Sequence, residues 1–136
     1  VLVRHAETVA AGENPGLSAA GEERARRLAS ALEFTGLDAI YTSELLRTVE
    51  TAAPVAALTG VEPAVVPAAD LRELVRTLTR EHRGDTVLVV GHSNTLPLLA
   101  GALGEPIADI AEADYGNIYI VRSGPFAPSW MIRLRY

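Results

Sequence analysis

The strongest constraint on the fold is a unit that occurs twice in the sequence. A short apolar run rich in β-branched residues is followed at once by a histidine segment and then by a helical pattern, first at Val1–Val3 and again at Thr86–Val90. Runs of this kind are typical of buried parallel strands, and a strand followed by a helix is the repeating unit of α/β folds. The two runs therefore predict a parallel sheet in which two strands end at a histidine segment.

The rest of the chain extends this alternation of strands and helices. Further strands are expected at Ala39–Thr42, near Ala64–Val66, at Ile118–Arg122 and at Trp130–Arg135, the last two around a turn at Gly124–Pro128. Helices are expected at about 18–33, from 43 onward, around 71–78 and near 95–103. Ser18 and Ser43 are predicted to cap the first two helices, and Pro54 is expected to kink or divide the second.

These elements predict one fold class for the whole chain. We expect a single domain over residues 1–136, an α/β protein with three layers (α/β/α) and a mainly parallel central sheet. An antiparallel hairpin at the C-terminal edge is compatible with this arrangement, because the last two predicted strands are consecutive.

Composition restricts the chemistry and the partners. The net charge of −5 argues against nucleic acid and acidic membranes as partners, and no apolar run approaches the roughly 20 residues of a membrane span. The chain has no cysteine, and all 12 basic residues are arginine, so an anion has to be bound by guanidinium groups. We expect a cytoplasmic protein that is either a monomer or a dimer. Because the sequence opens at Val1, inside an apolar run, we also expect that its true beginning was removed or is not included. An exported form is therefore the alternative to a cytoplasmic protein.

Four candidate residues fall near the carboxyl ends of predicted strands. Arg4 and His5 follow the first strand, His92 follows the strand at 86–90, and Arg47 lies in the helix after another strand. Ligands of open parallel sheets bind at this edge, so we expect these residues to be neighbours in space. The alternatives are that each histidine is structural and that Arg47 is a surface residue paired with an adjacent glutamate.

The same residues lie in motifs that resemble one family. Arg4-His5-Ala6-Glu7 resembles the R-H-[GA]-E motif of the histidine phosphatase superfamily, which includes the phosphoglycerate mutases. Three further stretches agree with the family in order: Leu17-Ser18 with Gly21, Thr42-Ser43 with Arg47-Thr48 and Glu50-Thr51-Ala52, and Gly91-His92-Ser93. The resemblance spans residues 1 to about 100 and implies a phosphoglycerate mutase-like fold.

The resemblance also implies roles for these residues. His5 would be the nucleophile, Arg4 and Arg47 would bind phosphate, and His92, expected to be cationic, would be a further donor. A neutral imidazole can attack phosphorus and form a phosphohistidine that water then cleaves, without a metal or another cofactor.

Additional substrate-binding candidates come from the same motifs: Glu7, Ser18, Ser43 and Ser93. We expect Glu7 to orient Arg4 or Arg47 through an ion pair, whereas helix capping is the favoured role of Ser43.

The expected activity is that of a small bacterial phosphatase, which hydrolyses phosphomonoesters or phosphohistidine through phosphorylated His5. The substrate would be a phosphorylated small molecule or a phosphoprotein. One alternative is a phosphate-binding module without turnover. A phosphoglycerate mutase-type phosphotransferase is less favoured, because the chain lacks long insertions to enclose its substrate. A serine esterase that uses Ser93 is disfavoured, because no histidine follows that serine.

The general acid is the least determined part of the predicted site. Leu71-Arg72-Glu73 matches an L-x-E segment of the family, which makes Glu73 a candidate acid and Asp70 a second one. Asp70 and Glu73 also have the spacing of a capping box, in which both side chains serve the helix backbone. A site without a dedicated carboxylic acid is the third possibility. His82, at the end of the same helix, is expected to be inert.

Overall fold

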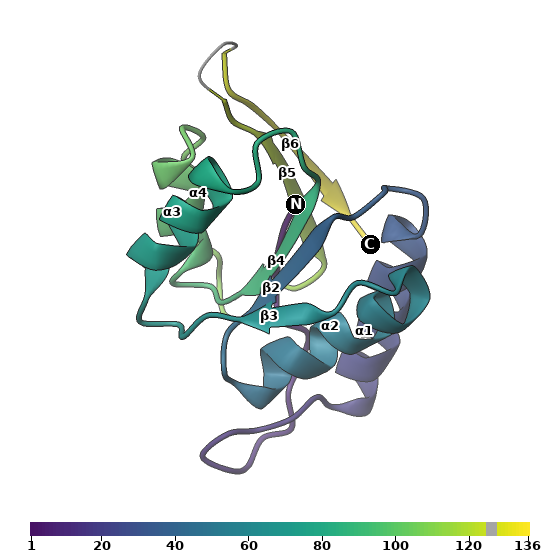
Figure 1. Cartoon of the computed structure of the whole chain (residues 1–136). Helices are drawn as coiled ribbons and strands as arrows, with labels where there is room; N and C mark the ends of the chain where they lie inside the picture. Colours follow the sequence, from purple (N-terminus) through teal and green to yellow (C-terminus); the bar gives the residue numbers. More distant parts are fainter. Residues whose placement is uncertain (125–127) are drawn as a thin grey trace.

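In the computed structural model, which describes residues 1–124 and 128–136, strands and helices alternate along most of the chain (Figure 1). The elements are β1 (Leu2–Arg4), α1 (Ala19–Leu32), β2 (Ala39–Thr42), α2 (Leu46–Thr59), β3 (Pro63–Val65), α3 (Leu71–Arg80), β4 (Val87–Gly91), α4 (Leu96–Ala102), β5 (Asn117–Arg122) and β6 (Trp130–Arg135). Each predicted strand and helix is present, with bounds shifted by a few residues at most. The predicted turn at Gly124–Pro128 falls mainly outside the described residues.

The strands form one mixed sheet in the order β3-β2-β4-β1-β5-β6. β1, β2, β3 and β4 are parallel to one another, whereas β5 pairs antiparallel with β1 and β6 pairs antiparallel with β5. The expected antiparallel hairpin at the C-terminal edge is therefore confirmed. Because β1 and β4 are adjacent, the two histidine segments that follow them lie side by side.

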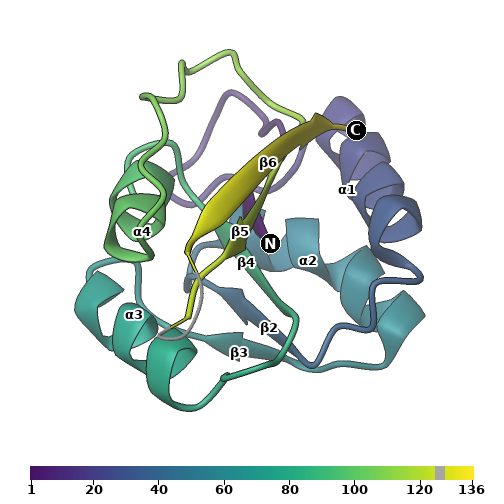
Figure 2. The same cartoon turned by 90° about the horizontal axis from the view of Figure 1, so that it is seen from above.

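Helices cover both faces of the sheet, as the predicted three layers require. Figure 2 shows α1 and α2 on one side and α3 and α4 on the other. Alternate residues of the central strands point into two separate cores. Leu88 and Val90 of β4 pack toward α1 and α2, while Val89 packs against Leu96 and Leu99 of α4.

The start of α1 follows from local chemistry. Ser18 is the N-cap, as predicted, and its hydroxyl accepts a hydrogen bond from the backbone N–H of Gly21. Gly21 packs so closely on Glu7 that a Cβ atom there would lie 2.1 Å from the Glu7 carbonyl oxygen. The motif Leu17-Ser18 with Gly21 thus fixes α1 against the segment that follows β1.

The start of α2 differs from the prediction. Leu45, not Ser43, is the N-cap, and it makes no capping hydrogen bond through its side chain. The hydroxyl of Ser43 is instead directed at His92. Pro54 does not divide α2, which continues as one helix from Leu46 to Thr59. Among the described residues, the helices lack the length and the apolar character needed to cross a membrane.

Candidate active site

The two predicted histidines meet at the carboxyl edge of the sheet. Arg4 pairs with Gly91 in the β1–β4 ladder, and the next residue, His5, donates its backbone N–H to the Gly91 carbonyl at 2.9 Å. His92 follows Gly91, so its ring lies beside that of His5, with 5.4 Å between the ring centroids. Both rings are buried, with 7% of each residue exposed.

His5 is oriented through one ring nitrogen. Its Nδ1 lies 2.8 Å from the carbonyl oxygen of Ala6, which assigns the Nδ1 proton to that bond and leaves Nε2 with a lone pair. The N–H of Ala6 donates to the hydroxyl of Thr51, which fixes this turn. Burial, with the nearby charges of His92 and the arginines, lowers the pKa of His5 to about 4. At neutral pH the ring is uncharged, as a nucleophile must be.

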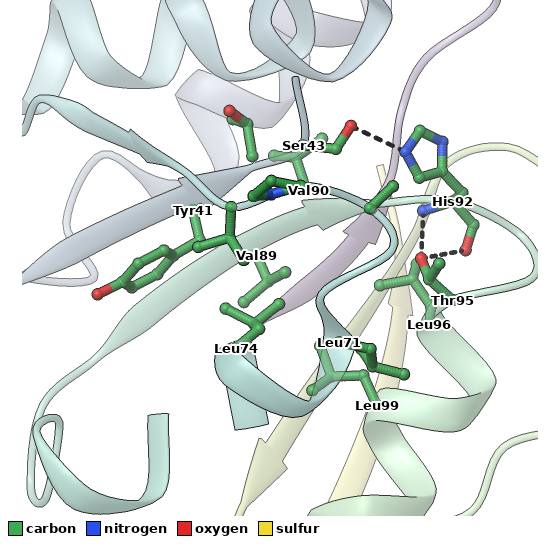
Figure 3. Close-up of a pocket in the computed structure, with 15 residues that line it drawn as sticks. Tyr41, Ser43, Leu71, Leu74, Val89, Val90, His92, Thr95, Leu96 and Leu99 are labelled. Atoms are coloured by element: carbon green, nitrogen blue, oxygen red, sulfur yellow. Dashed lines mark hydrogen bonds between the residues drawn. The ribbon is translucent and has the colours of Figure 1, made fainter. Parts of the chain in front are cut away.

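His92 is held by the hydroxyl of Ser43. Its Nε2 lies 2.9 Å from the Ser43 Oγ (Figure 3). The Ser43 Oγ also contacts the Thr48 hydroxyl. The Nδ1 of His92 is buried and has no hydrogen-bond partner among the described residues. Burial and then the charge of Arg47 lower the pKa of His92 to about 4. His92 is therefore neutral in the site without a ligand, because desolvation disfavours the charged ring; the expected cation concerns the site with a phosphoryl group bound.

Arg4 is fixed by the loop between α4 and β5. Its Nη1 donates to the carbonyls of Ala111 at 2.9 Å and Glu112 at 2.7 Å, and its guanidinium carbon lies 4.2 Å from the centroid of the Tyr115 ring. The Nε atom of Arg4 is buried and has no hydrogen-bond partner within the described residues. A buried donor without a partner is costly, so Arg4 Nε is a candidate donor to an anionic ligand.

Arg47 lies in the first turn of α2, close to both histidines. Its charge is among the causes that lower the pKa values of His5 and His92. The alternative partners of Arg47 are engaged elsewhere: Glu44 accepts from the N–H of Ala68, and Glu50 accepts from the N–H of Leu17. Within the described ranges Arg47 forms no ion pair, so its charge remains available to an anion.

Glu7 has a different partner from the predicted one. Its carboxylate forms an ion pair with Arg24 of α1, with 2.6 Å between Glu7 Oε1 and Arg24 Nη2, and not with Arg4 or Arg47. Hydrogen bonding to Arg24 lowers the pKa of Glu7 below its ordinary value. Arg24 lies one turn beyond Gly21, whose close packing brings α1 within reach of Glu7.

The other predicted substrate-binding residues differ in their surroundings. Ser18 uses its hydroxyl at the start of α1, where it also donates to the Glu7 carbonyl. Ser93 follows His92 and is half-buried. Ser43 is the one whose hydroxyl directly contacts a site histidine.

The carboxylate of Glu73 makes no contact with these groups within the described residues. It pairs with Arg76 one turn along α3, and 49% of the Glu73 side chain is exposed. The predicted capping box is wrong, because Asp70, the N-cap of α3, makes no capping hydrogen bond through its side chain. The side chains of Asp70 and Glu73 thus make no capping hydrogen bond, and in the part of the chain that the structure describes neither contacts the histidines.

An apolar cavity lies beside His92, between the sheet and the helices α3 and α4 (Figure 3). Its wall includes Leu71, Leu74, Leu96 and Leu99, with Ser43 and His92 at one side. These leucines belong to the apolar core on this face of the sheet, and the backbone N–H of Leu96 donates to the His92 carbonyl.

Comparison with known proteins gives the family of this chain. The profile of the histidine phosphatase superfamily (branch 1) matches residues 1–75, which include Arg4, His5 and Arg47. The chain belongs to the histidine phosphatase superfamily. This confirms the resemblance inferred from the motifs. The PE-PGRS family protein PE_PGRS11 of Mycobacterium tuberculosis is 42% identical over 75 residues, 48% of this chain, and the match spans 13% of that longer protein.

Solved structures of phosphatases share the fold of this family member. The protein histidine phosphatase SixA, solved with tungstate, superposes with a TM-score of 0.82 at 17% identity and covers 98% of this chain and 94% of its own. The mycobacterial glucosyl-3-phosphoglycerate phosphatase Rv2419c, solved with inorganic phosphate, has a TM-score of 0.71 at 19% identity and covers 89% of this chain and 87% of its own. At these identities the likeness establishes the fold.

Sequence reasoning missed several residues that shape the site. Tyr115 and the carbonyls of Ala111 and Glu112 contact Arg4, and Arg24 holds Glu7. Backbone carbonyls in a loop leave no signal in the residue types. Thr51, by contrast, lies in the motif Glu50-Thr51-Ala52. A threonine at a motif position is a signal for a hydrogen bond, and its hydroxyl accepts from the N–H of Ala6.

Proposed function

We propose that this protein is a phosphatase that forms a covalent phosphohistidine on His5. The observation that supports this most directly is the pair of adjacent neutral histidines flanked by two arginines. His5 presents a free Nε2, while Arg4 Nε and His92 Nδ1 are buried atoms without a hydrogen-bond partner among the described residues. Such an arrangement fits an anion with several oxygens, and a phosphoryl group has that shape and charge.

In the proposed reaction, Nε2 of His5 attacks phosphorus as the bond to the leaving group breaks. The leaving group departs with the bonding electron pair and takes up a proton from solvent. The positive charge that develops on the His5 ring is stabilised by the hydrogen bond from its Nδ1–H to the Ala6 carbonyl. Water then attacks phosphorus and releases a proton to solvent, and the P–N bond breaks with its electron pair returning to Nε2 of His5. Arg4 and Arg47 neutralise the equatorial oxygens in both steps.

The same arrangement restricts the substrates. Among the described residues, no carboxylate forms a hydrogen bond or ion pair with His5 or His92, and His92 is neutral before the ligand binds. Glu44 is near enough for its charge to raise the pKa of His92, but its carboxylate accepts a hydrogen bond from the N–H of Ala68. Leaving groups that depart readily, such as the imidazole of phosphohistidine or a phenolate, are therefore favoured over alkoxides. SixA, which shares the fold, is a protein histidine phosphatase, in line with this substrate class.

The test is to trap the phosphoenzyme. We expect the parent to become labelled by a phosphate donor such as phosphohistidine, and the label to be acid-labile and alkali-stable. His5→Ala should lose the label and at least about a thousandfold of the turnover rate, as is usual for a nucleophile. His82→Ala is the matched control, because His82 contacts Tyr41 and Asp85 instead of the site, and it should keep the label.

The outcomes separate the competing functions. An acid-labile phosphoenzyme in His5→Ala would contradict the proposed nucleophile. Tight binding of phosphate by a parent that forms no phosphoenzyme would indicate a binding module without turnover. Transfer of the phosphoryl group to a second position of the donor, in place of phosphate release, would indicate a mutase-type phosphotransferase.

A further inference from the structure

Tyr115 reaches the candidate site because β5 runs antiparallel to β1. The pairs Leu2–Tyr119 and Val3–Ile118 align the two strands, so the beginning of β5 lies at the carboxyl end of β1. Tyr115 precedes β5 by two residues and is half-buried there. A residue distant from the family motifs is thus brought against Arg4 and His5.

The ring of Tyr115 contacts both residues of the nucleophile motif. It lies against the Arg4 guanidinium, 4.2 Å from the ring centroid to Cζ, and its hydroxyl is 3.4 Å from Arg4 Nη2. Its centroid is also 6.3 Å from that of His5, in an edge-on arrangement. Stacking of a guanidinium on a tyrosine ring fixes the plane of the guanidinium, and it is stronger where water is excluded, as it is for buried Arg4.

The remaining contacts of Arg4 determine which of its donors is free. Nη1 is engaged by the carbonyls of Ala111 and Glu112. The N–H groups of Nε and Nη2 point in parallel on another edge of the planar guanidinium, and this edge binds phosphate or carboxylate oxygens in a bidentate manner. Nε is buried and without a partner among the described residues, and Nη2 has one long contact to Tyr115.

We infer that Tyr115 is a positioning residue of the phosphate site. Its ring sets the plane of Arg4 so that the Nε–Nη2 edge meets two oxygens of the phosphoryl group. The inference rests on the phosphatase function proposed above. It assigns the effect to the aromatic ring, because the hydroxyl contact at 3.4 Å is too long for a strong hydrogen bond.

The test compares binding of vanadate, a phosphate analogue, by calorimetry in four proteins: the parent, Tyr115→Phe, Tyr115→Leu and Tyr41→Leu. Tyr115→Phe keeps the ring and should bind within about twofold of the parent. Tyr115→Leu removes the stacking and should bind about tenfold more weakly, with a similar fall in kcat/KM. Tyr41→Leu makes the same change at a half-buried tyrosine that contacts His82, and it should bind as the parent does.

Two results would overturn the inference. Vanadate binding by Tyr115→Leu as tight as that of the parent would show that Arg4 does not need the ring, and Tyr115→Phe as weak as Tyr115→Leu would assign the effect to the hydroxyl. If the leucine variant fails to fold, Tyr115→Gln, which also lacks a ring, replaces it. A parent that binds vanadate but forms no phosphoenzyme would count against the proposed function and would leave the role of Tyr115 in binding intact.

Discussion

Single residues in this site are defined by what their polar atoms contact. His5 uses Nδ1 on the Ala6 carbonyl, His92 uses Nε2 on Ser43, and Arg4 uses Nη1 on a loop. The atoms left over, His5 Nε2, His92 Nδ1 and Arg4 Nε, are those that a phosphoryl group would engage. In each of these residues, one polar atom is hydrogen-bonded within the protein, and another polar atom remains for a ligand.

At this scale we predict that Glu73 does not act as the general acid. Its carboxylate pairs with Arg76 on an exposed face of α3, so Glu73→Gln should alter kcat/KM by less than about twofold on both alkyl and nitrophenyl phosphates. Solvent screens an exposed ion pair, so the melting temperature should change little. Steady-state kinetics on the two substrate types check this. A loss on alkyl phosphates much larger than that on nitrophenyl phosphate would restore Glu73 as the acid.

At the scale of the elements, α3 is tied to the sheet by a network that contains the third histidine. His82, one residue past the C-cap of α3, has its Nε2 at 2.7 Å from the Tyr41 hydroxyl and its Nδ1 at 2.9 Å from the Asp85 carboxylate. Tyr41 belongs to β2, which ends next to Ser43. His82 therefore has a structural role, and the expectation that it takes no part in the site agrees with its contacts.

We predict that His82→Ala lowers the free energy of unfolding by about 1–3 kcal/mol, because it leaves the Tyr41 hydroxyl without its partner. Vanadate affinity should stay within about twofold of the parent. Urea unfolding and calorimetry measure the two quantities. Arg83→Ala, which removes an exposed side chain that bonds only to the Thr79 carbonyl among the described residues, is the control and should cost less than about 0.5 kcal/mol.

At the scale of the whole molecule, the two site histidines link folding to pH. Burial lowers the pKa values of His5 and His92 to about 4, from an ordinary value of 6.5. The unfolded chain therefore binds more protons than the native protein between these values. The contribution of these histidines to the free energy of unfolding is fully present above pH 6.5 and is lost as the pH falls toward 4. The largest loss is on the order of 3 kcal/mol for each histidine.

We predict that the midpoint of urea unfolding falls as the pH is lowered from 7 to 5. Glu7 contributes little to the pH dependence of stability in this range, because its ordinary pKa is 4.5 and the fold lowers that pKa further. His92→Gln removes one of the two titrating rings, so its midpoint should depend less steeply on pH than that of the parent. Equal slopes for the two proteins would show that His92 is not buried as a neutral ring.

The sequence by itself determined the fold class, the strand and helix positions and four residues of the candidate site. Strands that alternate with helices leave few topologies, and Arg4, His5, Arg47 and His92 stand in motifs at the ends of those strands. Ser18 was also predictable as an N-cap, because capping depends on contacts within one turn.

Tertiary structure decided the partners and the protonation of these residues. Glu7 pairs with Arg24, Ser43 bonds to His92, and Tyr115 stacks on Arg4, and each contact joins segments far apart in the sequence. Burial also makes His92 neutral in the site without a ligand. Local patterns depend on neighbours along the chain, whereas hydrogen-bond partners and desolvation depend on which distant segments pack together, and this is why the sequence alone did not reveal them.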